Sequence, residues 1–282
     1  MITILGKNFD KKYLDKVKTL SLSPEAIQKE HDLKIVFTPL HGTTYELVPA
    51  SLRNWAFTNI HTVPEQSIPD GDFPTVASAN PEEPAAFKMA LDLARKIDAD
   101  LAMACDPDGD RIGIAVKNDA GEWTLLNGNQ TNIIFTEYII RRKKELNQLK
   151  GGEYTVKTIV TTELIKDIAE KNHIICYDVY TGFKWIADVI RKEGGEKFIG
   201  GGEESFGYMP GAFTRDKDGV SATSLMAEIA AWVKMQNKTL YSFLKEIYAK
   251  YGFSQERMVG SERKGLSGAQ EIKAMMEEFR HN

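Results

Sequence analysis

The sequence has little cysteine, no long apolar run and no excess of positive charge. Its 282 residues include only two cysteines, Cys105 and Cys176, which lie far apart and outside any CxxC pattern. This usage argues against a disulfide framework and indicates reduced thiols in a cytosolic protein. No stretch of 18 or more apolar residues is present, and the N-terminal MITILGKNFDKK lacks a basic segment followed by an apolar core. We therefore expect no membrane span, no signal peptide and a cytoplasmic location.

The charge balance argues against nucleic acid as a partner. Lysine and arginine number 36 against 40 aspartates and glutamates, for a formal net charge of −4. No basic excess is available to neutralise a phosphate backbone. This net charge still allows a small anionic ligand that is bound by a few well-placed lysine or arginine side chains.

The composition that is present is typical of a folded, soluble protein. Hydrophobic residues make up 42% and charged residues 27% of the chain, which is ordinary for globular domains. The length corresponds to about two domains, and a chain of this size can bury a sizeable core.

Short β-rich runs alternate with helical patterns in two successive units. Such alternation predicts an α/β fold class with largely parallel or mixed sheets. We expect the first α/β domain over 33–126 and the second over 127–252. The segment 1–32 is expected to be a helical linker, and 253–282 a second linker.

Three helical patterns end the chain. Helices over 220–235 and 240–251 are expected to complete the second unit. The last helix has four apolar residues on one face: Ile272, Met275, Met276 and Phe279. An isolated short helix is marginal in water, so we expect this helix to be mobile or to pack on a neighbouring molecule.

The sharpest motif is Asp-Pro-Asp-Gly-Asp-Arg between two apolar strands. Its carboxylates, Asp106, Asp108 and Asp110, can converge on one hard cation such as Mg²⁺ or Ca²⁺. A solvated acidic turn is the simpler alternative, but three acids and Arg111 between buried strands favour the metal. An EF-hand is excluded, because its glycine position would hold Arg111 and its glutamate position Lys117. A cation beside an arginine is typical of phosphoryl transfer.

A second motif is the glycine-rich run GGGEESFG after a predicted strand. Glycines let the backbone approach a ligand, and Glu203 and Ser205 could hydrogen-bond sugar hydroxyls. The spacing does not match a P-loop. A glycine-rich loop with merely solvated acids is an equally good interpretation of this motif alone.

Two further loops could contact an anion. In YTGFKW, Thr181 and Gly182 lie at a strand-to-helix junction, where Thr181 could cap the helix and the helix N-terminus could bind an anion. In TRDKDG, Lys217 could reach an anionic substrate. Simple capping and a solvated charged loop are the plainer interpretations.

Three isolated residues are weaker candidates. Lone histidines such as His41 are most often structural or surface residues. Ser78 has no following histidine to serve as its base, so we interpret it as a loop residue. Cys105 lies beside the acidic cluster, and thiolate activation needs positive surroundings.

Taken together, CDPDGDR, YTGFKW, GGEESFGY and TRDKDG occur in the order and spacing of the α-D-phosphohexomutase family, which the sequence resembles over about 33–252. The chain looks like a phosphoglucomutase/phosphomannomutase. Its TPLHG and VPEQ…FPTV…NPEEP stretches are similar to the phosphoglucomutase/phosphopentomutase-type branch. The resemblance implies two phosphoglucomutase-like, three-layer α/β domains, the second and third of the four in the family.

The resemblance also implies roles for individual residues. Asp106, Asp108 and Asp110 match the family's Mg²⁺ loop, which makes Mg²⁺ the expected cofactor. Arg111 matches a residue that contacts phosphate, and Lys217 matches a lysine near the bound substrate.

The sugar contacts follow from the same resemblance. Thr181 and Gly182 match a substrate-contacting loop of the third domain. Glu203 and Ser205 match the pair that grips sugar hydroxyls and lets the sugar bind in two orientations. The expected ligands are glucose 1-phosphate and glucose 1,6-bisphosphate, with mannose or pentose phosphates as alternatives.

In the family a phosphoserine donates its phosphoryl group to a sugar monophosphate, and the bisphosphate intermediate reorients before returning the other phosphate. That serine lies in a Ser-His-Asn-Pro-type loop of the first domain, which this sequence lacks, as it lacks the phosphate loop of the fourth domain. We therefore expect a piece of a longer enzyme, with no catalytic nucleophile of its own, inactive without domains one and four.

Two alternatives stay open at this point. The chain could be a stand-alone module that binds Mg²⁺ and a sugar phosphate without turnover; an upstream Ser-His-Asn-Pro loop in the reading frame would argue against it. A haloacid-dehalogenase-type phosphatase ranks lower, because Arg111 interrupts the D-x-D-x-[TV] pattern that such an enzyme needs.

Overall fold

A five-stranded mixed sheet forms the first lobe of the computed structural model, which describes residues 5–256 and 263–281. Its strand order is β2-β1-β3-β4-β5; β1 is parallel to β2 and β3, whereas β4 is antiparallel to both of its neighbours. The central strands are buried on both faces, as their apolar sequences require. The strands are β1 Ile35–Thr38, β2 Ile60–Thr62, β3 Leu101–Cys105, β4 Ile112–Lys117 and β5 Trp123–Leu126.

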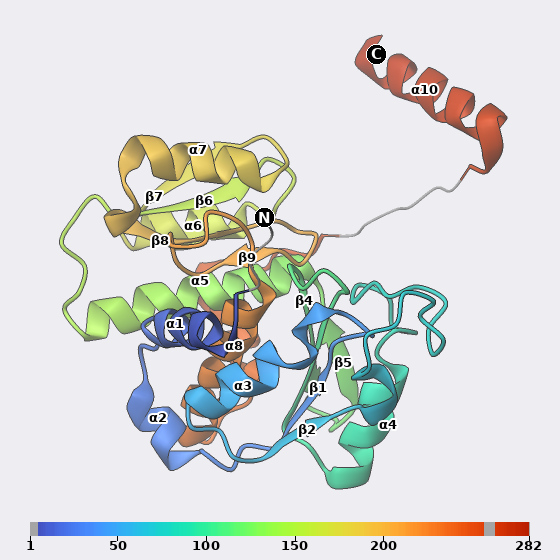
Figure 1. Cartoon of the computed structure of the whole chain (residues 1–282). Helices are drawn as coiled ribbons and strands as arrows, with labels where there is room; N and C mark the ends of the chain where they lie inside the picture. Colours follow the sequence, from blue (N-terminus) through green and yellow to red (C-terminus); the bar gives the residue numbers. More distant parts are fainter. Residues whose placement is uncertain (1–4, 257–262, 282) are drawn as a thin grey trace.

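Helices cover both faces of this sheet. On one face α4 (Lys88–Ile97) packs on β1 and β3, while α3 (Leu47–Asn54) and α8 (Gly219–Met235) lie on the opposite side. The N-terminal helices α1 (Lys7–Lys18) and α2 (Pro24–Lys29) pack on α3 and α8. The first lobe therefore has the three expected layers (Figure 1).

The second lobe is built on a four-stranded mixed sheet with the order β7-β6-β8-β9. Its strands β6, β7 and β8 are parallel, and the short β9 is antiparallel to β8. Helix α7 covers one face, and α5 and α6 cover the other. The elements are α5 Gly128–Glu145, β6 Tyr154–Thr158, α6 Leu164–Lys171, β7 Ile175–Val179, α7 Phe183–Glu193, β8 Phe198–Gly202 and β9 Tyr208–Met209.

Helix α8, which is expected to complete the second unit, does not pack within the second lobe alone. It packs chiefly against α2, α3 and the first sheet, and reaches the second lobe through β9 and α5. Helix α9 (Leu240–Tyr251) contacts α5, α6 and also β4. One continuous hydrophobic core consequently runs from the first sheet through α8 and α5 to α6. The reason is that α8 is mostly apolar and is buried on every side from Gly219 to Val233, so it needs neighbours all round.

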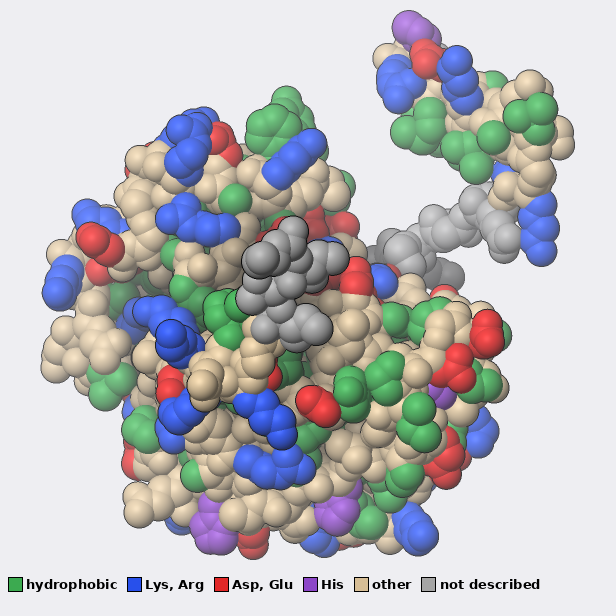
Figure 2. All heavy atoms as spheres, in the orientation of Figure 1, with side chains coloured by type: hydrophobic (Ala, Val, Ile, Leu, Met, Phe, Trp, Pro, Cys, Tyr) green, Lys and Arg blue, Asp and Glu red, His purple; other side chains and the backbone are tan. Residues whose placement is uncertain are grey.

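The last helix, α10 (Gly265–His281), stands apart from both lobes in Figure 1. Figure 2 shows hydrophobic side chains uncovered along it. All four residues of the expected apolar stripe are exposed, Phe279 by 75%. Within the described part of the chain, no helix has the length and apolar character needed to cross a bilayer.

Candidate functional site

The three aspartates of the acidic motif converge in the turn between β3 and β4. These strands pair antiparallel up to Cys105 and Ile112, so the connecting loop must reverse within six residues. Gly109, with φ +80°, supplies the left-handed conformation that this reversal needs. One carboxylate oxygen from each of Asp106, Asp108 and Asp110 lies within 4.8 Å of the others. A set of carboxylate oxygens at this spacing suits a hard divalent cation such as Mg²⁺.

Asp106 anchors the loop from its buried position. Its Oδ1 accepts hydrogen bonds from the backbone N–H groups of Asp110 (3.1 Å) and Arg111 (3.0 Å). Its Oδ2 accepts from Nε of Arg111 at 2.5 Å. The buried charge is thus paired and hydrogen-bonded, which a carboxylate in the protein interior requires.

The pKa values of the other two carboxyls, Asp108 and Asp110, are both raised. Burial and the neighbouring Asp106 carboxylate raise the pKa of Asp108. Burial, again together with Asp106, raises the pKa of Asp110 to about 6, although the Lys217 ammonium opposes the change. Burial is the larger cause of both shifts, and a bound cation would relieve the charge repulsion that adds to it.

Two cations adjoin the acidic loop. Arg111 is one, through its ion pair with Asp106. Lys217, from the loop before α8, has its Nζ 3.4 Å from Oδ2 of Asp110 and lies over the ring of Phe183 at 5.8 Å. The structure therefore brings Lys217 to the acidic motif, more than a hundred residues away in the sequence.

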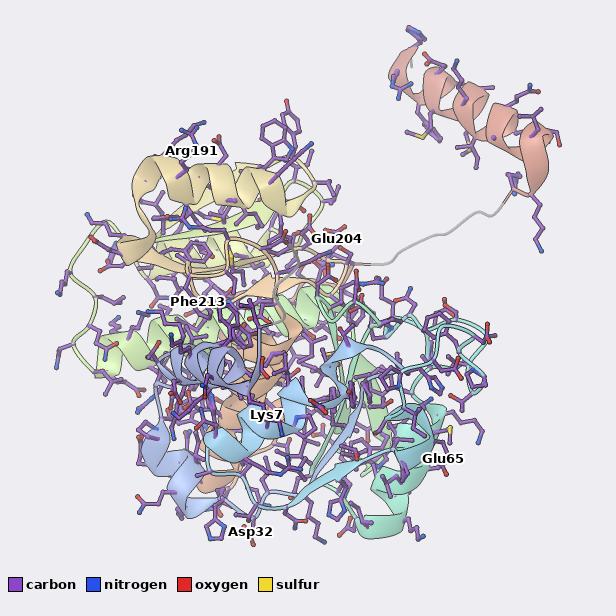
Figure 3. All side chains as sticks on the ribbon, viewed as in Figure 1. Lys7, Asp32, Glu65, Arg191, Glu204 and Phe213 are labelled. Atoms are coloured by element: carbon purple, nitrogen blue, oxygen red, sulfur yellow. The ribbon has the colours of Figure 1, made fainter. Side chains whose placement is uncertain are left out.

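The glycine-rich loop after β8 meets the acidic loop directly. Arg111 and Gly207 form an isolated antiparallel bridge, and the N–H of Ile112 donates to the carbonyl of Phe206 at 3.1 Å. Figure 3 places Glu204 at the junction of the two lobes. The two motifs, which are far apart in the sequence, are therefore hydrogen-bonded neighbours in the fold.

The polar residues of the glycine-rich loop have different partners. Glu203 is buried, and its Oε1 accepts a hydrogen bond from the N–H of Gly182 at 2.7 Å. Ser205 is half-buried on the same loop. The Glu204 carboxylate instead accepts from the hydroxyls of Thr158 and Thr161. Glu203 thus ties the glycine-rich loop to the start of α7.

The capping role expected for Thr181 is wrong. Helix α7 begins at Phe183, so Gly182 is its N-cap, and no side chain caps the helix. Gly182 has a φ of +116°, a conformation that favours glycine. Thr181 is exposed at the edge of the site, where it remains a candidate substrate contact.

The three weaker candidates, His41, Ser78 and Cys105, are all held or buried by neighbouring protein groups. His41 is buried, with its ring nitrogens 3.0 Å from the Ile68 carbonyl and 2.8 Å from the Thr75 hydroxyl. The Ser78 hydroxyl donates to Glu83. Burial raises the pKa of the Cys105 thiol to about 12, so it is no nucleophile at neutral pH.

Sequence reasoning missed three side chains that support the site. Asn80 and Glu82 both accept hydrogen bonds from Arg111. Asp218 caps α8 by accepting from the N–H of Val220 and also accepts from the hydroxyl of Tyr13. The NPEEP and TRDKDG motifs contain these residues, but neither motif indicates which distant group they contact.

Two family models match the sequence. Residues 11–121 match the alpha/beta/alpha domain II of phosphoglucomutase/phosphomannomutase, and residues 127–251 match the alpha/beta/alpha domain III. Among curated relatives, the phosphoglucomutase of Staphylococcus aureus (strain MRSA252) is 38% identical over 252 residues, covering 89% of this chain and 45% of the relative. The chain thus spans less than half the length of that relative.

Solved structures show the same fold. A structure described as a phosphomannomutase from Thermus thermophilus has a TM-score of 0.69 at 21% identity, covering 87% of this chain and 51% of that one. Aspergillus fumigatus N-acetylphosphoglucosamine mutase, in complex with GlcNAc-6P and magnesium, has a TM-score of 0.51 at 14% identity, with coverages of 84% and 53%. A second structure of that mutase, with glucose 1,6-bisphosphate, has a TM-score of 0.52 at 16% identity, covering 84% and 49%.

Proposed function

The chain belongs to the phosphoglucomutase/phosphomannomutase family, and on that basis we propose that it carries the metal-binding and sugar-binding domains of a phosphohexomutase. The proposed reaction is a Mg²⁺-dependent phosphoryl transfer between the C1 and C6 (or C5) hydroxyls of a sugar phosphate, through a bisphosphate intermediate. Glucose 1-phosphate and glucose 1,6-bisphosphate are the proposed ligands, with mannose or pentose phosphates as alternatives. The phosphoglucomutase relatives and the neighbour with bound glucose 1,6-bisphosphate support this choice.

The observation that carries the proposal is the junction between the two loops. Three carboxylates converge in the turn that precedes Arg111, and the backbone of Arg111 pairs with Gly207 of the glycine-rich loop. The proposed cation site and the loop with the proposed sugar-binding groups therefore adjoin each other. Such adjacency is what the transfer of a phosphoryl group to a sugar hydroxyl requires.

Each residue has a role in the proposal. Asp106, Asp108 and Asp110 would hold Mg²⁺, which withdraws negative charge from phosphoryl oxygens. Arg111 and Lys217 would stabilise the charge that remains on those oxygens, because fixed cations favour charge that develops in the transition state.

The sugar itself would be held by the second lobe. Glu203 and Ser205 would hydrogen-bond its hydroxyls, and Thr181 and Gly182 would contact it from the start of α7. The carboxylate of Glu203 already bridges these two loops. Accepting from a sugar hydroxyl with its remaining lone pairs would therefore place the substrate between them.

The nucleophile is proposed to come from outside these residues. The 282 residues contain no Ser-His-Asn-Pro loop. The chain alone would then bind ligand without turnover, and the complete site would need the first and fourth domains of the family.

A binding experiment tests this proposal. Calorimetry with glucose 1,6-bisphosphate in the presence of Mg²⁺ should show binding by the wild type and weaker binding by Lys217→Ala. Lys88→Ala is the matched control, because Lys88 is an exposed lysine of α4 whose one ion pair among residues 5–256 and 263–281 is with Asp92. Equal affinity in all three proteins, or no binding by the wild type, would contradict the proposed site.

A further inference from the structure

The guanidinium of Arg111 is held on two of its three nitrogens. Nε donates to Asp106 at 2.5 Å, and Nη1 donates to Oδ1 of Asn80 and Oε1 of Glu82, each at 3.2 Å. Within residues 5–256 and 263–281, Nη2 has no hydrogen-bond partner. One edge of the guanidinium is thus fixed by protein groups while the Nη2 donors remain available.

The two acceptors come from a loop about thirty residues earlier in the chain, between β2 and α4. Asn80 links the two groups, because its Oδ1 accepts from the backbone N–H of Glu82 at 3.1 Å as well as from Arg111. The Glu82 side chain is only 17% exposed and that of Arg111 26%, so both are largely removed from solvent. The contact therefore fixes the loop and the guanidinium together.

We propose that Asn80 and Glu82 are positioning residues, which orient the guanidinium of Arg111 so that its Nη2 edge meets the phosphoryl group. This inference rests on the proposed function, in which Arg111 binds phosphate. The guanidinium is planar and presents its donors in a rigid fork, so fixing Nε and Nη1 also fixes the direction of Nη2. An arginine already held in place loses less conformational freedom when the ligand binds.

Charge and position predict opposite effects for Glu82. Its carboxylate lies beside the cation that would bind phosphate, so on charge alone its removal should tighten binding of an anion. If its task is to hold the guanidinium, its removal should weaken binding. Asn80 is uncharged, and its removal tests position without changing the charge.

The experiment measures the affinity for glucose 1,6-bisphosphate with Mg²⁺ in the 282-residue chain. Asn80→Ala and Glu82→Ala should each weaken binding by about fivefold, the size expected for one lost hydrogen bond. Glu83→Ala is the matched control, because Glu83 accepts from Ser78 and has no hydrogen bond to Arg111 in the described chain. Glu82→Gln keeps an oxygen acceptor and should retain wild-type affinity or exceed it.

Two results would overturn the inference: unchanged affinity in Asn80→Ala, or tighter binding in Glu82→Ala. Arg111→Ala separates this failure from failure of the proposed function. If Arg111→Ala binds as wild type, Arg111 has no phosphate role; if it loses binding while the Asn80 and Glu82 variants do not, only the positioning role is wrong.

A spectroscopic readout distinguishes orientation from general stability. A held guanidinium rotates slowly about its Cζ–Nη bonds and gives separate N–H signals in NMR spectra. These Arg111 signals should merge in Asn80→Ala and Glu82→Ala, whereas the backbone spectrum stays that of the wild type. Separate Arg111 signals in both variants would contradict the proposal.

Discussion

The hydroxyl of Tyr13 donates to both carboxylate oxygens of Asp218, at 2.8 and 2.7 Å, although 205 residues separate them. Asp218 in turn caps α8 and immediately follows Lys217. Burial and the nearby Asp218 charge raise the pKa of Tyr13 far above its usual value, so the hydroxyl stays protonated and remains a donor. The N-terminal helix is thereby fastened to the loop that carries Lys217.

Replacing Tyr13 by phenylalanine should lower the free energy of unfolding by about 1–3 kcal/mol, because a hydrogen bond to a charged acceptor is lost. Urea unfolding followed by circular dichroism measures the change. Tyr45→Phe is the control: Tyr45 is exposed, and no hydrogen bond of its hydroxyl occurs in the described chain. Equal losses in both variants would contradict a special role for the Tyr13 hydroxyl.

Asp108→Ala should abolish Mg²⁺ binding or weaken it at least tenfold. Asp106, Asp108 and Asp110 would supply three carboxylate ligands, and water would complete the coordination of the ion, so the wild-type affinity should itself be weak. Calorimetry with Mg²⁺ or Mn²⁺ measures the difference. Asp119→Ala, at an exposed aspartate paired with Lys245, should bind as the wild type; equal binding by Asp108→Ala would refute the metal site.

Glu228 should make the wild type less stable as the pH rises. This carboxyl lies between α8, α5 and the α1–α2 loop, where its oxygens accept from the N–H of Leu22 at 2.8 Å and from the hydroxyl of Tyr138 at 2.7 Å. Burial raises its pKa above 4.5, against the hydrogen bonds from Ser21 and Leu22 that lower it. The folded state therefore holds the proton more tightly than the unfolded chain does.

Above pH 4.5 the unfolded chain releases the Glu228 proton, whereas the folded protein still holds it. The contribution of Glu228 to the free energy of unfolding is therefore present at acid pH and declines as the pH rises through the raised pKa. The Glu228→Gln variant has no carboxyl that titrates at this position. Its free energy of unfolding relative to wild type should therefore increase between acid and neutral pH. Urea unfolding at several pH values measures this difference, with exposed Glu170→Gln as a control that should show no trend. A difference independent of pH would contradict the shift.

Gly128→Ala should lower the free energy of unfolding by about 1–3 kcal/mol through overpacking. A Cβ at this position, the first residue of α5, would lie 1.9 Å from the carbonyl oxygen of Glu204 and 2.8 Å from the nitrogen of Phe206. These are backbone atoms that cannot rotate away. Thermal or urea unfolding measures the effect, and Gly71→Ala, which would meet nothing within 4 Å, should be nearly neutral.

The chain by itself should have no mutase activity. Three of its serine hydroxyls already have acceptors: Ser78 donates to Glu83, Ser221 to the carbonyl of Asp218, and Ser224 to that of Val220. The assay incubates the protein with Mg²⁺, glucose 1-phosphate and glucose 1,6-bisphosphate and measures glucose 6-phosphate. Sustained conversion that disappears in Asp108→Ala would show that a nucleophile lies within these 282 residues.

The parts of the site that were predictable from sequence are local. The turn from Asp106 to Asp110 lies between two apolar strands. Its three carboxylates belong to one short loop, so they must lie close together. The α/β class and the mixed sheets likewise follow from the order of short periodic segments. Strands β5 and β9 were not predicted, because they have four and two residues and little periodicity.

The remaining features depend on contacts between distant residues. No sequence pattern indicates that Asn80 meets Arg111 or that Tyr13 meets Asp218, since hydrogen-bond partners across the fold have no fixed spacing. The packing of α8 on the first sheet is of the same kind. The cap of α7 was misassigned by one residue, because Gly182 adopts a conformation that Thr181 would resist.

The location of α8 determines whether the two lobes can be produced as separate proteins. A cut in the chain at 126/127, between the two sheets, would leave the first half without the helix that covers its sheet beside α3. Each half would then expose apolar surface that only the other half can cover. Neither half should be soluble when expressed alone, whereas co-expression of the two halves should restore the complex. A gene fusion should therefore keep both lobes in one segment.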